Sequence, residues 1–227
     1  AEGVRKGMPL KQAMRRCKRA TLLSPRPYLY QKAMGAFLKE LQSYSPRIES
    51  GQTDGHFFVD VTGTHRLYGP PPDLGWRVRR DVRKHLGINP IWALGSNRLV
   101  SKVASRLVKP VGEYIVTPGE ESSFLAPLPI EILPGLYEKE LEKMREFRLT
   151  TIGALARLDL KQLMIPFGSR CETLHALSRG EDDTLIDLPA AAKNCVEAEH
   201  VFVDDTSSKS EIEAVLASLV GRAGLAL

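Results

Sequence analysis

The spacing of hydrophobic residues divides the chain into a mixed α/β region followed by a helical region. Several segments have apolar residues at helical spacing, and helices are predicted at residues 8–19, 30–45, 74–86 and 97–107. Between them lie short runs rich in aromatic and β-branched residues, and strands are predicted at residues 57–62, 90–95 and 113–118. Because strands and helices alternate, residues up to about 118 are expected to form one α/β sheet domain.

Polar residues and glycines at the ends of these segments set their expected boundaries. Asp73 stands where an N-cap is favoured, before the apolar positions of residues 74–86, and Gly87 follows them as a helix stop. Ser96 or Asn97 is placed to cap the next helix. The helix at residues 74–86 also has a basic face, which is expected to be solvated surface rather than a DNA track and comprises Arg77, Arg79, Arg80, Arg83 and Lys84.

The pattern changes after residue 118. A proline-rich stretch marks a boundary, and from Pro134 to Gly180 short amphipathic segments alternate with glycine turns, which predicts a small all-helical domain. An acidic linker follows, and then one strand, residues 199–205, and one helix, residues 209–224. One strand and one helix cannot bury a core, so the last domain is expected to be cut off.

Charge along the chain is asymmetric. The net charge is +5, but residues 1–180 hold 29 Lys+Arg against 17 Asp+Glu, whereas residues 181–227 hold 3 against 10. A basic body is typical of a protein that binds a phosphate backbone, although basic helix faces are also common as plain solvated surface. No apolar run approaches the roughly 20 residues of a membrane span.

The cysteines and the chain start set the expected compartment. Cys17, Cys171 and Cys195 are widely spaced and form no CxxC pair, so neither a disulfide framework nor a zinc site is indicated, and cytoplasmic thiols are the simpler interpretation. The first residues contain no initiator methionine and no secretory signal, so the sequence is expected to be a piece whose true start lies upstream.

Four segments in order resemble the Y-family DNA polymerases, the UmuC-like translesion group. Residues 3–17 (GVRKGMPLKQAMRRC) look like the end of the fingers domain, and residues 44–63, ending in FFVDVTG, look like the palm segment with the second group of catalytic acids. Residues 86–116 are similar to the remaining palm signature, which includes a Ser-Asn capped helix and a Lys-Pro-x-Gly turn. Residues 125–156 are similar to the thumb.

This resemblance implies a fold and a domain division. The implied fold is an α/β palm, a mixed sheet with helices, plus a small all-α helix-hairpin-helix thumb and fragments of the fingers and little-finger domains. The implied boundaries are residues 1–24 for the end of the fingers, 25–118 for the palm, 119–182 for the thumb, 183–198 for a linker and 199–227 for the truncated start of the little finger.

The resemblance also implies a two-metal centre, which needs Mg²⁺ if the protein is active. The family supplies an adjacent Asp-Glu pair before Asp-Val-Thr-Gly, but here the spacing is one residue too long. In one register Asp54 takes the Asp place and Gly55 the Glu place; counting back from Asp60, Gly55 and His56 take both. Neither register contains an Asp-Glu pair, so only Asp54 remains as a candidate catalytic residue and metal ligand, and Asp60 is expected to be structural.

Other site residues follow from the same resemblance. Lys109 matches a lysine that reaches the incoming triphosphate. Two hairpin turns resemble those that contact a DNA phosphate through backbone N–H groups, and their predicted DNA-binding residues are Gly135, Leu136, Gly168, Ser169 and Arg170. Without the resemblance, Asp54 is an exposed turn residue, Lys109 a surface lysine, and the two turns ordinary helix caps.

In lacking these carboxylates, the sequence resembles the branch of the accessory mutasome subunit ImuB, which has lost catalytic carboxylates but keeps the polymerase body. The expected function is therefore a DNA-damage-response scaffold for translesion synthesis, binding primer-template DNA and associated with the nucleoid in the cytoplasm, with a sliding clamp and a catalytic polymerase as partners. Two alternatives stay open at this point. One is an active DNA-directed translesion polymerase, a nucleotidyltransferase, and the other is a protein-interaction module without DNA binding.

Overall fold

The computed structural model describes residues 3–4, 7–51, 55–186, 198–202 and 206–224. Helices dominate these segments: α1 (Leu10–Arg16), α2 (Pro27–Gln42), α3 (His65–Tyr68), α4 (Pro71–Leu86), α5 (Arg98–Leu107), α6 (Glu121–Leu125), α7 (Glu138–Glu146), α8 (Ile152–Ala156), α9 (Leu160–Phe167), α10 (Cys171–Arg179) and α11 (Lys209–Gly224), with 3₁₀ turns η1 (Ile130–Ile132) and η2 (Gly168–Arg170). The strands are β1 (Ile48–Ser50), β2 (Phe57–Val59), β3 (Trp92–Leu94) and β4 (Glu113–Ile115).

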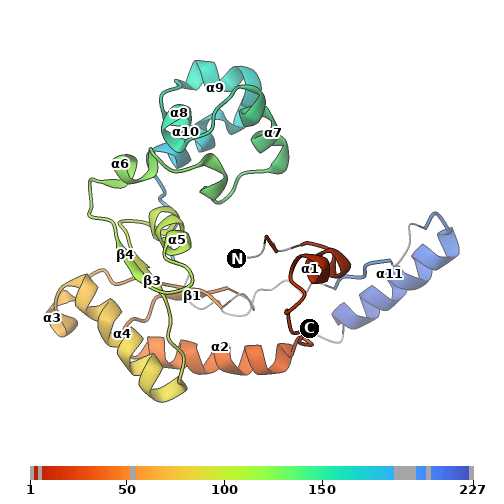
Figure 1. Cartoon of the computed structure of the whole chain (residues 1–227), viewed down its shortest axis with the longest axis horizontal. Helices are drawn as coiled ribbons and strands as arrows, with labels where there is room; N and C mark the ends of the chain where they lie inside the picture. Colours follow the sequence, from red (N-terminus) through yellow and green to blue (C-terminus); the bar gives the residue numbers. More distant parts are fainter. Residues whose placement is uncertain (1–2, 5–6, 52–54, 187–197, 203–205, 225–227) are drawn as a thin grey trace.

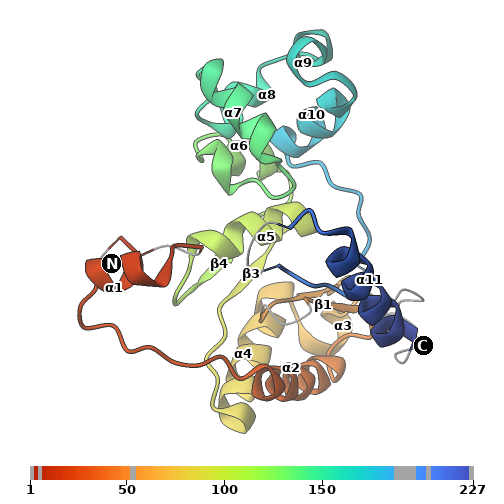
Figure 2. The same ribbon diagram turned by 90° about the vertical axis from the view of Figure 1, so that its right-hand side faces the viewer.

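Helix α5 lies in the middle of the arrangement, between the helices of the two ends. Helices α6 to α10 gather at one end of the molecule, α2 and α4 lie at the other, and α5 with β3 and β4 lies between them (Figures 1 and 2). Helix α2 packs against α4, and α4 packs against β3. The contact between α4 and β3 is close, because a Cβ added at Gly75 would lie 2.7 Å from the Trp92 ring.

The strands form two two-stranded sheets in the described part of the chain, not the single mixed sheet expected from the sequence. β1 pairs with β2 in antiparallel orientation, and β3 pairs with β4 in parallel orientation across α5. The prediction of both pairing directions within an α/β region is thus correct, but the prediction of one sheet is not. The alternation of strands and helices sets their order along the chain, whereas it does not decide which strands become hydrogen-bonded neighbours.

Prolines shift two helix starts from their predicted places. Helix α2 begins at Pro27, ahead of the predicted start, because Pro27 occupies the first helical turn, where a missing N–H costs nothing. The predicted N-cap of α4 at Asp73 is wrong for the same reason. Pro70 is the cap, Pro71 begins the helix, and Asp73 lies inside the first turn. Gly87 and Asn97 take their predicted capping roles.

The basic face of α4 is not uniformly solvated, which corrects the expectation for Arg79. The Arg79 guanidinium lies 2.6 Å from a carboxylate oxygen of Glu113 on β4 and donates a second hydrogen bond to Asn89. The Arg79 side chain is only 18% exposed, so this ion pair helps to fix α4 against the β3–β4 sheet.

The main hydrophobic core lies in the helical unit, defined here as residues 121–180. Its fully buried side chains include Ile130, Met144, Ile152 and Leu163. The proline-rich boundary stretch contributes to this core through α6 and η1, which the sequence pattern did not predict as helical. Leu125 of α6 is completely buried in this core. A short helix between prolines can therefore still contribute a core side chain.

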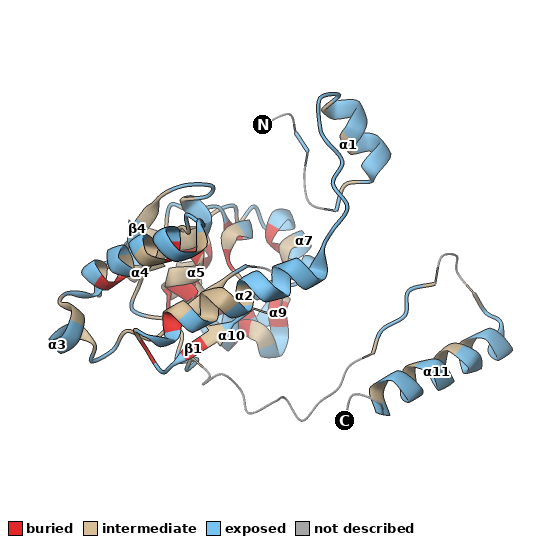
Figure 3. Ribbon diagram, turned by 90° about the horizontal axis from the view of Figure 1, so that it is seen from below, coloured by how far each residue is buried: buried red, intermediate tan, exposed pale blue. Residues whose placement is uncertain are grey.

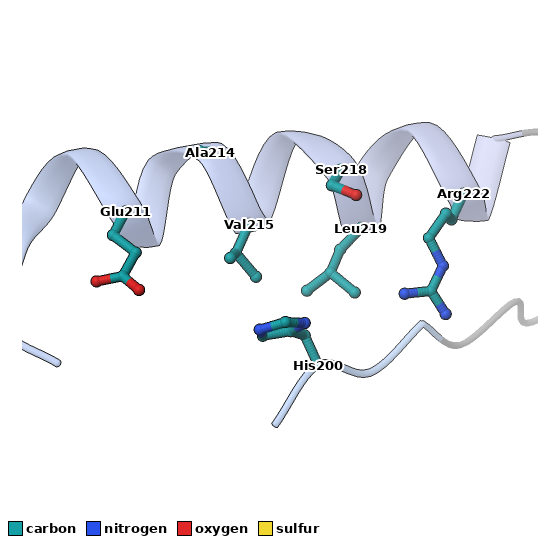
Figure 4. A pocket seen from close by; sticks show the side chains of 7 residues that line it. All are labelled: His200, Glu211, Ala214, Val215, Ser218, Leu219 and Arg222. Atoms are coloured by element: carbon teal, nitrogen blue, oxygen red, sulfur yellow. The ribbon is translucent and has the colours of Figure 1, made fainter. Parts of the chain in front are cut away.

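Helices α1 and α11 stand apart from this core and contain no buried residues (Figure 3). The predicted strand at residues 199–205 is wrong over its described part, since residues 198–202 adopt no regular structure. A single extended segment gains ladder hydrogen bonds only beside a partner strand. Instead, His200 lies under α11, near Val215 and Leu219, where it lines a hollow of about 260 Å³ (Figure 4).

Candidate active-site centre and hairpin turns

Strand β2 presents two different faces, because successive side chains of a strand point in opposite directions. Phe57 stacks on Phe37 of α2 with ring centroids 4.9 Å apart, which anchors one face to that helix. Phe58 lies on the other face, beneath two cations of α5. The Arg98 guanidinium carbon lies 4.7 Å from the Phe58 ring centroid and the Lys102 ammonium nitrogen lies 5.3 Å from it.

Polar groups complete this cluster, which we call the α5 centre: Glu49, His56, Phe58, Arg98 and Lys102. The Lys102 Nζ lies 2.9 Å from the Nε2 of His56, and since an ammonium can only donate, Nε2 is the acceptor. Arg98 forms an ion pair with Oε1 of Glu49. The other carboxylate oxygen, Oε2, is buried and accepts no hydrogen bond from the described residues. The α5 centre therefore brings together side chains from β1, β2 and α5.

The described residues do not fit a two-magnesium site. Gly55 has no side chain to offer and adopts a φ of +75°, His56 uses its facing nitrogen as an acceptor for Lys102, and the carboxylate of the α5 centre, Glu49, is paired with Arg98. Mg²⁺ instead prefers anionic oxygen ligands in octahedral geometry. No cluster of three potential ligands occurs among the residues that the structure describes. Asp54, the predicted ligand, lies outside the described residues.

Asp60 makes the structural contacts predicted for it. Its Oδ1 accepts a hydrogen bond of 2.9 Å from the N–H of Thr62, and its Oδ2 lies 3.7 Å from a guanidinium nitrogen of Arg47. Its backbone carbonyl accepts a further bond from the hydroxyl of Ser45. Asp60 thus stabilises the turn that leaves β2.

The predicted triphosphate lysine, Lys109, follows helix α5, which carries two residues of the α5 centre. Lys109 is exposed in the turn that follows α5, where its ammonium can reach a ligand in solution. The role of Lys109 stays a prediction, because geometry alone establishes only its accessibility.

The two predicted hairpin turns are accessible at their glycines. Gly135 has a φ of +80° and Gly168 a φ of +55°, which is the region that favours glycine, and both are exposed, as is Ser169. Leu136 differs from these residues, because its side chain packs against the core of the helical unit. Only its backbone is therefore available for a phosphate contact.

Arg170 links the two turns. Its Nε lies 2.7 Å from Oε1 of Glu140, its Nη2 donates a 2.8 Å hydrogen bond to the carbonyl oxygen of Gly135, and its guanidinium lies over the ring of Tyr137. Burial alone would raise the pKa of the Glu140 carboxyl, but hydrogen bonds from Arg170 and from the Tyr137 N–H outweigh burial and lower it. The hydrogen bond with Glu140 raises the pKa of Arg170.

Comparisons with known proteins show which proteins this chain is similar to. Residues 1–106 match the impB/mucB/samB family. The chain is 31% identical over 217 residues to a DNA polymerase IV of Dehalococcoides mccartyi, covering 96% of this chain and 55% of the relative. It is 34% identical over 194 residues to the DNA polymerase IV of Desulfatibacillum aliphaticivorans, covering 86% of this chain and 49% of the relative. The chain is thus similar, over most of its length, to proteins described as DNA polymerase IV.

A solved structure shows the same fold. The crystal structure of DinB from Sulfolobus solfataricus superposes with a TM-score of 0.69 at 19% identity, covering 82% of this chain and 55% of the other. The α/β arrangement with helices is therefore consistent with the palm-like fold of that structure. The chain spans about half the length of the curated relatives it matches. No helix among the described residues is long and apolar enough to cross a bilayer.

Sequence reasoning missed Glu49, Arg98 and Lys102. Arg98 and Lys102 are four residues apart in a predicted helix, which places them on one face, and His56 stands two residues before Phe58, at the spacing of one strand face but just ahead of the predicted strand at residues 57–62. These two periodicities indicated pairs of neighbours. Only the packing of α5 on β2 shows that the two pairs meet.

Proposed function

We propose that this chain belongs to a DNA-damage-response protein with a Y-family polymerase body, which binds primer-template DNA and acts chiefly as a noncatalytic or impaired scaffold for a mutagenic polymerase complex. The observation that carries the proposal is the pairing of Lys102 with His56 at the α5 centre. In one register His56 occupies the place of the family's catalytic glutamate, so a neutral nitrogen engaged with an ammonium stands where a metal-binding carboxylate is required.

The same reasoning limits what the centre can do chemically. Lys102 and Arg98 place two cationic side chains on successive turns of α5, Lys102 beside His56 and Arg98 paired with Glu49. Such a centre is poorly suited to holding a pair of divalent cations. As in the ImuB branch, loss of the metal site would leave the DNA-binding body intact, with a sliding clamp and a separate catalytic polymerase as the expected partners.

DNA contact is proposed at the two hairpin turns of the helical unit. Gly135, Gly168 and Ser169 are exposed there, and the first 180 residues carry the chain's positive charge. Arg170 supports these turns from behind rather than reaching outward, because its guanidinium is engaged by Glu140 and Gly135. The phosphate contacts would therefore be made largely by backbone N–H groups, which recognise no particular base.

Primer extension by the intact protein tests the proposal directly. Incorporation with Mg²⁺ or Mn²⁺ should not exceed that of the Asp54→Ala variant, while the protein still binds primer-template DNA with log affinity falling linearly against log salt concentration. Binding that is absent or insensitive to salt would instead indicate a protein-interaction module.

The second candidate function is an active translesion polymerase. It is favoured by the relatives described as DNA polymerase IV and by Glu49, a carboxylate in the α5 centre that could replace a missing ligand if Arg98 released it. Sustained incorporation that is lost in both Asp54→Ala and Glu49→Gln would establish this candidate and overturn the scaffold.

A further inference from the structure

The segment that leaves the helical unit folds back onto the N-terminal end of α5. Asn97 caps this helix, since its Oδ1 accepts a 2.9 Å hydrogen bond from the N–H of Val100. The Nδ2 of the same side chain donates a 2.6 Å hydrogen bond to the carbonyl oxygen of Gly180. Asp182 adds a second cap, because its Oδ2 accepts a 2.9 Å hydrogen bond from the N–H of Leu99. One end of α5 is thus capped partly from 83 residues away in the sequence.

The fit around Gly180 is close. This residue is buried and has a φ of +79°, and a Cβ there would lie 2.9 Å from the Cβ of Glu121 and 3.1 Å from a methyl carbon of Leu125. Glu121 is itself joined to the residue before Asn97, since a hydrogen bond from Ser96 lowers the pKa of its carboxyl. The segment that enters the helical unit at Glu121 and the segment that leaves it at Gly180 therefore both contact the N-terminal end of α5.

The apolar packing beneath these hydrogen bonds is continuous. Leu99 and Val103 of α5 belong to the same buried cluster as Leu125 and Leu174 of the helical unit. A boundary drawn at residue 118 would leave α5 in the palm although it contributes to the core of the neighbouring unit. A neighbouring face of α5, about 100° around the helix, carries Arg98 and Lys102 of the α5 centre.

We propose that Asn97, Gly180 and Asp182 form a clasp that fixes the helical unit on α5 and thereby sets the distance between the hairpin turns and the α5 centre. Asp182 is a positioning residue, which acts on DNA through the geometry of these two surfaces and makes no contact with DNA itself. The structural role of the clasp does not depend on the proposed function, and only its effect on DNA rests on the proposed DNA binding.

A distance measurement in the intact protein tests the clasp. Spin labels are placed at exposed Arg83 of α4 and exposed Lys161 of α9, with Cys17 and Cys195 replaced by serine and buried Cys171 retained. Wild-type protein should give a narrow distance distribution by pulsed electron paramagnetic resonance, and Asp182→Ala a broad one. Asp182→Asn should stay narrow, because its one amide oxygen can still accept from the Leu99 N–H, at the expense of the hydrogen bond from the Thr184 N–H. A narrow, unshifted distribution in a folded Asp182→Ala variant would overturn the clasp.

A second variant covers the case in which Asp182→Ala does not fold. Asn97→Asp keeps the Oδ1 cap of Val100 but removes the N–H that bonds Gly180, so the distribution should broaden while the helix stays capped. An unchanged distribution in this variant would remove Asn97 from the clasp.

Measurements of DNA affinity distinguish a positioning role of Asp182 from the effect of its negative charge. Loss of a negative charge should by itself tighten DNA binding, and exposed Asp183→Ala isolates that effect as a matched control. Asp182→Ala should instead weaken binding, because the spacing between the two surfaces is no longer fixed, with an unchanged salt slope. Tighter binding in both variants would overturn the positioning role. If the wild-type protein binds no DNA, the proposed function fails while the distance measurement still decides the clasp.

Discussion

The Nη2 of Arg170 donates a 2.8 Å hydrogen bond to the carbonyl oxygen of Gly135, and so joins the two hairpin turns of the helical unit. Glu140 binds the same guanidinium, accepting from Nε at 2.7 Å and from Nη2 at 3.4 Å. The two turns therefore form one surface, on which the exposed backbone at residues 135 and 168 keeps a fixed spacing. For the proposed DNA binding, this fixed spacing would matter because a phosphate backbone is a regular array of charges.

Replacement of Arg170 by alanine should destabilise the helical unit. The Glu140 side chain is only 10% exposed, so it would be left largely buried without its guanidinium partner. We expect the free energy of unfolding to fall by about 2 kcal/mol, measured by urea denaturation.

Arg145→Ala is the matched control for that change. Arg145 also pairs with a glutamate of α7, Glu138, but both side chains are more than half exposed, and its loss should cost less than about 0.5 kcal/mol. Equal destabilisation by the two variants would show that the link between the turns contributes no more than a surface ion pair.

Two helix glycines are predicted to respond to alanine in opposite directions. A methyl group at Gly75 of α4 would lie 2.7 Å from the Trp92 ring, and Gly75→Ala should destabilise the protein by about 1 to 3 kcal/mol. Gly35 of α2 has no neighbour within 4 Å of the added carbon, so Gly35→Ala should stabilise by about 0.5 to 1 kcal/mol. Thermal unfolding of both variants measures the difference, and a shift of the same sign in both would contradict the close packing of α4 on β3.

The hydrogen bond between Tyr44 and Asp81 predicts a dependence of stability on pH. Hydrogen bonds from Arg80 and Tyr44 lower the pKa of Asp81 to about 2, and burial together with Asp81 raises the pKa of Tyr44 to about 12. The Asp81 contribution is present above the ordinary carboxyl pKa near 4 and is lost as the pH falls toward 2. The Tyr44 contribution is present below the ordinary phenol pKa of 10 and is lost as the pH rises toward 12.

Denaturation midpoints measured across both windows check these signs. Asp81→Asn should flatten the acid decline between pH 4 and pH 2, and Tyr44→Phe should flatten the alkaline decline between pH 10 and pH 12. Profiles that run parallel to wild type in both variants would mean that other groups dominate the titration.

A negative charge at the second hairpin turn should weaken DNA binding. Ser169→Glu places a carboxylate next to Gly168, and like-charge repulsion of about 1 kcal/mol at 4 Å in water corresponds to about fivefold in affinity. Ser122→Glu adds the same charge at an exposed position on α6 and serves as the control. Fluorescence anisotropy with a primer-template duplex at fixed salt measures both, and equal weakening would argue against a contact at this turn.

The fold could be predicted from the sequence wherever local signals decided it. The helix at residues 209–224 has its predicted bounds, and the Asn97 cap is correct, because caps and apolar spacing act within a few residues. Pairing between distant segments left no such signal. The split into two sheets, the missing strand over residues 198–202 and the burial of Leu125 all depend on which surfaces meet after folding.

The same division applies to the candidate site. The absence of an Asp-Glu pair is visible in the sequence, and so are the two glycine turns. The partners of Arg170 and Lys102 are not visible in the sequence. They lie 30 and 35 residues from Arg170 and 46 residues from Lys102, and the sequence does not distinguish a solvated basic side chain from a paired one.

Counting bound Mn²⁺ in the intact protein, with primer-template DNA and a nucleoside triphosphate present, tests the central claim most directly. Electron paramagnetic resonance distinguishes free from bound ions, and nucleotide without protein gives the reference. A scaffold whose α5 centre pairs Lys102 with His56 should bind no Mn²⁺ beyond this reference. Two additional bound ions per protein that disappear in Asp54→Ala would contradict it.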